Sequence, residues 1–376
     1  MRIYFDNAAT TQVSKPVSEC MVQVMGQMYG NPSSLHTMGM ESEKAMEAAR
    51  GQLAAAMKVE PACLYFTSGG TESDNLAVLG GARRNARGRK KILVSAAEHP
   101  AVAQPCAKLA QEGFEVCVVR IGPDGLLDLN HLESLADEQC VLATLMQVNN
   151  ETGCIMPLKE AVEILRKKAP RALIHSDMVQ ALGKTDMAAV DMASVSGHKI
   201  HGSKGVGALY LRKGVQIDPL VYGGGQERDI RPGTQNVPGI AGFGAAAEQL
   251  RPKETAAQLA ALKGQFLRLL EQEDIPFAVN GEGTVPHIVN ISFEGAKAEV
   301  LLHILEANGI MVSSGSACAS NKPSPSPVLT AMGLPRERID SAVRFSFSEY
   351  NTIEEAEYCV QVIKRELPAL RKMTRR

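Results

Sequence analysis

The chain has 376 residues, of which 45% are hydrophobic and 22% are charged, and its formal net charge is −1. These values are typical of a globular protein large enough for two domains, and the near-neutral charge argues against a nucleic-acid or anionic-membrane partner. Residues 1–7 have the pattern of a short strand rather than of a leader, and the sequence contains no uncharged apolar stretch of bilayer-spanning length. We therefore expect a cytoplasmic protein.

The first candidate binding site follows a strand expected at residues 63–66. Gly69 and Gly70 come directly after this strand, and a helical pattern occupies residues 76–84. Backbone amides and the positive end of a helix dipole then meet at one point, which is how proteins bind phosphate. Gly70 and Thr71 are the predicted phosphate ligands, and the alternative is a helix cap with a glycine turn.

Polar residues also follow the strands expected at 91–95 and 141–148, and another strand is expected at 115–120. His99 lies at the carboxyl edge of its strand, where the ring can stack on a planar cofactor or have a structural role. Asn150 can donate to a phenolate or carboxylate oxygen, although asparagines at strand ends also form turns.

A strand expected at residues 172–176 brings Asp177 and Gln180 to the same edge. An aspartate at this place can keep a pyridine nitrogen protonated, which makes the ring an electron sink. The alternative role for Asp177 is a helix cap.

A glycine-rich segment, residues 196–205, follows a strand expected at 190–195 and contains Lys199. A lysine partly desolvated at the end of a parallel strand can lose its proton and attack a carbonyl, which predicts a Schiff base with pyridoxal phosphate. The alternatives are a basic surface loop and a P-loop, since Gly197 and Gly202 have P-loop spacing. The P-loop is disfavoured because Gly-Ser-Lys follows where Gly-Lys-Ser/Thr is required.

The last third of the chain has the pattern of a smaller α/β unit. The glycine-rich residues 223–236 form either a flap or an arm that reaches a neighbouring subunit, and an amphipathic helix at 255–273 marks the domain boundary. Arg344 alternates with apolar neighbours, so it lies on a sheet face, where it can form a structural ion pair or bind a substrate carboxylate. Further strands and helices are expected at 288–293, 298–308, 343–347 and 353–367.

The eight cysteines are scattered, without a Cys-x-x-Cys pair or a Cys/His cluster at zinc spacing, so we expect neither structural disulfides nor a metal site. Seven of them lie in helix-like or strand-like patterns as small buried hydrophobic residues. Cys318 differs because it lies in a run of Ser, Gly, Ala and Pro, residues 313–327, that cannot pack as core. An exposed thiol is prone to oxidation, so we expect Cys318 to be reactive.

Together these motifs resemble the cysteine desulfurases of the NifS/IscS-like subgroup, which are fold-type I pyridoxal phosphate enzymes of the class V aminotransferase group. The resemblance covers nearly the whole chain in order, and the lysine after Ser-Gly-His and the cysteine in Gly-Ser-Ala-Cys match the long-loop subgroup. The segments that carry it are 6–11, 31–36, 67–75, 98–99, 148–153, 176–180, 196–205, 231–236, 313–320 and 344–346.

The resemblance implies an α/β fold with two domains. The large domain, residues 14–250, would contain a mostly parallel seven-stranded sheet. The smaller α/β domain, residues 1–13 and 251–376, would carry the catalytic cysteine loop.

The resemblance also implies a role for each candidate residue. Lys199 would form the Schiff base, His99 would stack on the ring and assist proton transfer, and Cys318 would take the sulfur. Arg344 and Asn150 would bind the substrate. The cofactor would be held by Gly70, Thr71, His99, Asn150, Asp177, Gln180, Ser196, His198, Lys199 and, from the other subunit of a homodimer, Thr234.

The implied reaction takes sulfur from L-cysteine, leaving L-alanine and a persulfide on Cys318 that passes to an acceptor protein for iron–sulfur clusters or tRNA thiolation. The alternative is a selenocysteine lyase or another β-eliminating enzyme, whereas an aminotransferase has no need of Cys318.

Three features depart from the family pattern. Ser203 stands where the family usually has proline, and residues 347–349 replace a small-residue continuation after the arginine strand. The chain ends at Arg376 without the longer tail that IscS-type members use to dock a scaffold protein, which puts an IscU-type partner in question.

Overall fold

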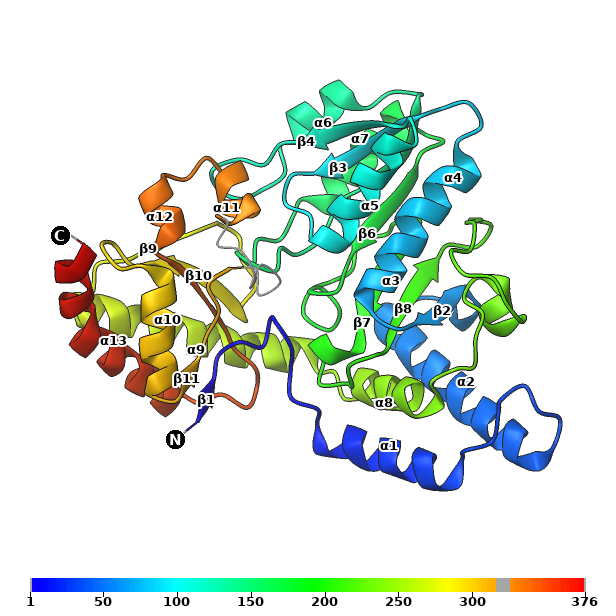
Figure 1. Cartoon of the computed structure of the whole chain (residues 1–376), viewed down its shortest axis with the longest axis horizontal. Coiled ribbons are helices and arrows are strands. Elements are labelled where there is room, and N and C mark those ends of the chain that lie inside the picture. The colour runs from blue at the N-terminus through cyan, green and yellow to red at the C-terminus, as the bar shows by residue number, and fades with distance from the viewer. Residues whose placement is uncertain (1, 316–324, 375–376) are drawn as a thin grey trace.

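The computed structural model describes residues 2–315 and 325–374. The chain forms a larger body around a seven-stranded sheet and a smaller body that contains both the N-terminal strand and the C-terminal helix (Figure 1). Helix α9 (Pro252–Gln272) runs from the larger body into the smaller one.

The large sheet has the strand order β2-β8-β7-β6-β5-β3-β4, and only β8 runs antiparallel to its neighbours. The carboxyl ends of the other strands therefore lie at one edge, and the predicted mostly parallel sheet is confirmed. Its strands are β2 (Leu64–Thr67), β3 (Lys91–Ser95), β4 (Glu115–Val119), β5 (Cys140–Thr144), β6 (Leu173–Asp177), β7 (Met192–Ser196) and β8 (Gly207–Leu211).

Helices cover both faces of this sheet because successive strand residues point in opposite directions. Leu93 packs in a core with α2, α7 and α8, whereas its neighbours Ile92 and Val94 pack with α5 and the helix that follows β2. The helices of the larger body are α1 (Lys15–Gln27), α2 (Thr37–Met57), α3 (Gly70–Asn75), α4 (Gly81–Asn85), α5 (Pro100–Gln111), α6 (Leu129–Leu135), α7 (Leu158–Lys168) and α8 (Val237–Glu248), with a π-helical turn, Leu76–Gly80, between α3 and α4.

The smaller body has its own core, in which Ile3 and Phe5 pack against the apolar face of α9. Ile288 and Leu329 pack in the larger core, so the two bodies are in continuous contact. The domain bounds 14–250 and 251–376 stay a prediction. The remaining elements are β1 (Ile3–Tyr4), β9 (Ala278–Val279), β10 (Ile288–Ser292), α10 (Ala298–Ala307), β11 (Ile310–Met311), α11 (Pro327–Ala331), α12 (Arg336–Asp340), β12 (Ala342–Ser346) and α13 (Ile353–Thr374).

The strand expected at 141–148 ends earlier, at Thr144. Beyond this point the Met146 amide donates to the buried Glu98 carboxyl at 2.6 Å, and the Gln147 side chain donates to the Asp186 carbonyl. On the β6 side the backbone ladder continues, because the amides of Leu145 and Gln147 donate to the carbonyls of His175 and Asp177 at 3.0 and 3.1 Å. The Met146 amide binds the Glu98 side chain instead of a strand carbonyl, so the regular strand has five residues rather than the expected eight.

The seven described cysteines are free thiols. Cys154 lies in the connection between β5 and α7 rather than in a helix or strand, so its predicted setting is wrong, although it is buried as expected. Cys318 lies outside the described residues. Within the described part of the chain, no helix combines the length and the apolar composition needed to cross a bilayer.

Candidate active site

A cavity of about 260 Å³ lies at the carboxyl edge of the large sheet, facing the smaller body. It brings together most of the residues predicted from the sequence. These are Gly70, Thr71, His99, Asn150, Asp177, Gln180, Ser196, His198, Lys199 and Arg344.

One predicted residue that the structure describes, Thr234, is absent from this lining. Thr234 is exposed elsewhere on the same chain, and its contribution to a partner's site stays a prediction. Cys318 lies outside the described residues, so its place relative to the cavity also stays a prediction.

Lys199 ends a short 3₁₀ turn that follows β7. Its Nζ donates to the carbonyl oxygens of Ala8 and Ala9, at 2.7 Å each. Gly202 closes the turn: its amide donates to the Gly197 carbonyl at 3.0 Å, and a Cβ at residue 202 would lie 2.7 Å from that oxygen. The segment then enters strand β8 rather than a helix, which excludes a P-loop.

A cradle of backbone amides opens at the start of α3. The Ser73 amide donates the first helical hydrogen bond, to the Gly69 carbonyl at 3.1 Å, so the amides of Gly70 and Thr71 precede the hydrogen-bonded turns. A Cβ on Gly70 would lie 2.7 Å from Cγ2 of Val179. Glycine is therefore needed at residue 70, and the cradle can hold an anion.

His198 lies beside this cradle and is held by the N-terminal segment. Its Nδ1 forms a 3.1 Å hydrogen bond with the Thr10 hydroxyl. Burial and the nearby charges of Lys199, Lys204 and Lys184 lower the pKa of His198 to about 4. The ring is therefore neutral at pH 7.

Asp177 ends strand β6 and is buried at the cavity wall. One carboxylate oxygen accepts from the Val179 amide at 2.9 Å. Burial raises the pKa of Asp177, whereas the hydrogen bond and the charges of His99 and Lys199 lower it. A cation beside this carboxylate would offset the cost of burying it.

His99 caps helix α5, because its Nδ1 accepts from the Ala101 amide at 3.1 Å. Burial and the charge of Lys199 lower the pKa of His99, while Asp177 raises it. Since Nδ1 is an acceptor, the neutral ring carries its proton on Nε2. The structural role expected for His99 as an alternative is present in this cap, and its ring also lines the cavity, where the cofactor role stays a prediction.

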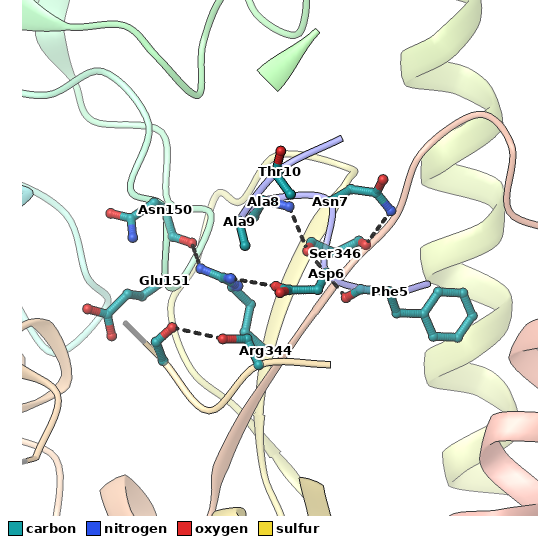
Figure 2. Close-up of polar contacts among 12 residues, drawn as sticks. Phe5, Asp6, Asn7, Ala8, Ala9, Thr10, Asn150, Glu151, Arg344 and Ser346 are labelled. Atoms are coloured by element: carbon teal, nitrogen blue, oxygen red, sulfur yellow. Dashed lines mark hydrogen bonds and ion pairs between the residues drawn. The ribbon is translucent and has the colours of Figure 1, made fainter. Parts of the chain in front are cut away.

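Arg344 extends from β12 to the cavity between two distant segments (Figure 2). Its Nη1 donates to the Asn150 carbonyl at 2.8 Å, and its Nη2 pairs with Asp6 at 2.7 Å. The buried Nε has no partner among the described residues. The structural ion pair is therefore present, and Nε remains able to donate to a further group.

The sequence motifs did not identify Asp74 as part of this site. Asp74 lines the cavity, and burial together with the charges of Asp177 and Glu98 raises the pKa of its carboxyl well above the usual range. Asp74 follows Gly70 by one helical turn, so the helix start itself could have indicated that it faces the same space. Ala8 and Ala9 belong to segment 6–11, one of those that carry the family resemblance, and the structure shows that their carbonyl oxygens accept from Lys199.

A mostly parallel sheet with a lysine, an aspartate and an amide cradle at its carboxyl edge is the arrangement of the fold-type I pyridoxal phosphate enzymes. Residues 3–359 match the family aminotransferase class-V. The chain is 41% identical to the cysteine desulfurase IscS of Methanosarcina thermophila, over 99% of this chain and 93% of that protein.

Solved structures agree with the sequence comparison. A NifS-like protein superposes with a TM-score of 0.92 and 38% identity, over 98% of this chain and 100% of the other. SspA in complex with cysteine superposes with a TM-score of 0.83 and 30% identity, over 94% of this chain and 100% of the other. The chain belongs to the class-V aminotransferase family and, within it, to the cysteine desulfurases.

Proposed function

We propose that this protein removes sulfur from L-cysteine with pyridoxal phosphate as its cofactor, releasing L-alanine and leaving a persulfide on Cys318. The observation that carries the proposal is the cavity in which Lys199, Asp177 and Arg344 meet. The solved complex of SspA with cysteine supports the choice of substrate. In the net reaction the carbon–sulfur bond of the substrate breaks and a sulfur–sulfur bond forms on Cys318, whose thiol proton balances the new C–H bond of alanine.

The residues of the cavity fit the phosphate end of the cofactor. The amides of Gly70 and Thr71 lie at a helix start, where phosphate binds well. Ser196 and His198 line the same cavity and would complete the phosphate shell. A Cβ at residue 70 would lie 2.7 Å from Cγ2 of Val179, another residue of the cavity wall, which explains the glycine.

The residues of the cavity also fit the ring. When bound, the cofactor supplies a carbonyl for the substrate amine and a ring that withdraws electrons from the substrate α-carbon. Lys199 would hold the cofactor aldehyde, and Asp177 would hold the pyridine nitrogen in its protonated form. His99 would stack on the ring, with Gln180 near the phenolic oxygen.

Two groups would accept and return protons during the reaction. Lys199 has its amine oriented by the carbonyls of Ala8 and Ala9. His99 is kept neutral by its lowered pKa, so it can take a proton from a thiol.

Arg344 and Asn150 would bind the substrate. The orphaned Nε of Arg344 can donate to a carboxylate, and the Asn150 side chain lines the same wall. Asp6 holds the guanidinium in place and so fixes where the carboxylate would lie.

The protein would act as a homodimer in the cytoplasm, with Thr234 reaching the phosphate of the partner's cofactor. An acceptor protein would then collect the sulfur from Cys318.

The test is to incubate the protein, loaded with pyridoxal phosphate, with L-cysteine and a reducing thiol, and to measure alanine and sulfide. The unaltered protein should form both in equal amounts. Cys318→Ala should keep the visible band of the cofactor but lose sulfide release by about 100-fold or more. Cys20→Ala, which alters a half-buried thiol on α1, is the matched control and should retain activity.

Undiminished turnover by Cys318→Ala would contradict the assignment of the sulfur acceptor. A strong preference for selenocysteine in the same assay would favour a selenocysteine lyase.

A further inference from the structure

A second large cavity, of about 350 Å³, lies at the opposite edge of the large sheet. Leu173, where β6 begins, and Asp191, directly before β7, are part of its lining. The same two strands lead at their other ends to Asp177 and Lys199. This cavity is therefore separate from the site described above.

The lining of this cavity is strongly basic. It contains five arginines from three parts of the chain and one carboxyl group, so its formal charge is about four positive units in a protein whose net charge is −1. The charged residues are Arg87, Arg89, Arg166, Arg171, Arg212 and Asp191. We call this set the arginine cavity.

Asp191 neutralises only part of this charge. The side chain of Asp191 is 1% exposed. Its Oδ1 forms ion pairs with Nη2 of Arg166 and Nε of Arg212, at 2.7 Å each. Its Oδ2 accepts from the Ile174 amide at 2.8 Å. Both oxygens of Asp191 thus have hydrogen-bond partners, and neither of them forms an ion pair with Arg87, Arg89 or Arg171.

The other arginines are not paired with acids. Arg89 donates to two neutral carbonyl oxygens, those of Cys140 at 2.6 Å and Asn85 at 3.0 Å. Arg87 and Arg171 form no side-chain hydrogen bond or ion pair with any residue between 2 and 315 or between 325 and 374. Burial, and then repulsion from Arg171 and Arg87, lowers the pKa of Arg89, so these guanidinium groups lie close enough to repel one another.

We propose that the arginine cavity binds a diphosphate group, either as free pyrophosphate or as part of a nucleoside diphosphate. Guanidinium groups form two parallel hydrogen bonds with phosphate oxygens, and several of them converge here on a concave space. A ligand with three or four negative charges would remove the mutual repulsion of the arginines. A monovalent anion would neutralise too little of the charge.

The proposal is tested by calorimetric titration of the cofactor-loaded protein at low ionic strength with pyrophosphate, ADP, inorganic phosphate and citrate. Loading with pyridoxal phosphate blocks the amide cradle of Gly70 and Thr71. Pyrophosphate and ADP should bind with one site per chain, and phosphate should bind at least about tenfold more weakly because it forms fewer charged hydrogen bonds. Tighter binding of ADP would identify a nucleotide as the source of the diphosphate.

The double variant Arg87→Gln with Arg171→Gln removes two exposed arginines that have no side-chain partner in the described part of the chain. It should keep its melting temperature and weaken pyrophosphate binding by about 100-fold, at about tenfold for each charged hydrogen bond. The matched control is Arg83→Gln with Arg84→Gln, which removes the same charge from neighbouring α4, outside the cavity. It should bind pyrophosphate almost as the unaltered protein does.

Three results would overturn the proposal. One is the absence of saturable pyrophosphate and ADP binding to the unaltered protein. Another is equal weakening in both double variants, which would show a general charge effect. The third is citrate binding as tight as that of pyrophosphate, which would show that the cavity does not select phosphate.

Discussion

Three carboxyl groups are buried near the carboxyl edge of the large sheet, those of Asp74, Glu98 and Asp177. Burial raises the pKa of all three. Asp177 is also next to His99 and Lys199, whose charges lower its pKa, whereas Asp74 and Glu98 are affected by further carboxyl groups. Among these three carboxyl groups, Asp177 is therefore the one best placed to be ionised beside a bound cation.

The charge of Asp177 is testable by an isosteric change. Asp177→Asn should lower the rate of alanine formation by about 10²- to 10⁴-fold, because a neutral amide cannot stabilise a protonated pyridine. Asp74→Asn changes a carboxyl whose pKa is raised by burial and by neighbouring carboxyl groups, so it should have a much smaller effect. Equal losses in the two variants, measured as kcat with L-cysteine, would contradict this assignment.

His175 controls part of the pH dependence of stability. It is fully buried, with hydrogen bonds to the hydroxyls of Thr144 at 2.8 Å and Ser194 at 3.0 Å, and burial lowers its pKa to about 3. The unfolded chain binds a proton at this residue below its ordinary pKa of about 6.5 and the folded chain does not, so stability falls as the pH drops from 6.5 toward 3.

His175→Gln should therefore lose less stability than the unaltered protein between pH 7 and pH 5, because glutamine does not titrate. Urea midpoints at the two pH values give this difference directly. Asp74 lies 3.6 Å from His175 and titrates in the opposite sense in both proteins, so the comparison isolates the histidine. Parallel losses in the two proteins would refute the account of His175.

At the scale of elements, the loop between β2 and α3, which carries the proposed phosphate ligands, depends on how closely β8 passes behind it. A Cβ on Gly207, the first residue of β8, would lie 2.6 Å from the Cα of Gly69. The loop after β2 and the start of β8 therefore fit together only if residue 207 is glycine.

Gly207→Ala should displace the loop and weaken binding of pyridoxal phosphate at least about tenfold, as well as lower the melting temperature. Gly51→Ala is the control, since Gly51 lies within α2 and a Cβ there meets nothing within 4 Å. That change should raise the melting temperature slightly. Unchanged cofactor affinity in Gly207→Ala, measured by fluorescence titration, would show that the loop tolerates the shift.

The sequence predicted most of the large sheet because its strands are short apolar runs that end in polar loops. The polar residues after these strands indicated Gly70, Thr71, His99, Asn150, Asp177 and Lys199, whereas Ser196 and His198 came from the family resemblance and Asp74 was missed. Helix α8 gave no comparable signal, since Val237–Glu248 is apolar on almost every side and lacks the period of a half-buried helix. The early end of β5 was also hidden, because it depends on the Met146 amide binding the carboxyl of Glu98, a residue distant in sequence.

At the scale of the whole molecule, the wall of the cavity is formed by residues near both ends of the chain together with residues of the larger body. Asp6, from the N-terminal segment, and Asn150, from the larger body, hold the two ends of the Arg344 guanidinium (Figure 2). The smaller body therefore supplies the proposed substrate-binding group, while the edge of the sheet supplies the groups that we propose to bind the cofactor. The alternation of apolar residues indicated Arg344, and the end of a strand indicated Asn150. Their meeting with Asp6 required the three-dimensional fold.

The proposed homodimer also belongs to this scale. Leu35 is 97% exposed and Tyr29 is 72% exposed in the connection between α1 and α2, and water contact is unfavourable for such apolar side chains. If this connection lies in the dimer interface, Leu35→Asp should shift the protein to a monomer in light scattering. Alanine formation should then also fall, because Thr234 would no longer reach a partner.

Val300→Asp, on α10, changes an apolar side chain that is 40% exposed and should leave the dimer intact. A dimer that persists in Leu35→Asp would place the interface elsewhere.

The most direct measurement is to treat the cofactor-loaded protein with borohydride and locate the attached phosphopyridoxyl group by peptide mass spectrometry. We predict the added mass on Lys199 alone, with Lys184 and Lys204 unmodified. A label on either neighbouring lysine, or a protein that takes up no cofactor, would contradict the proposed function.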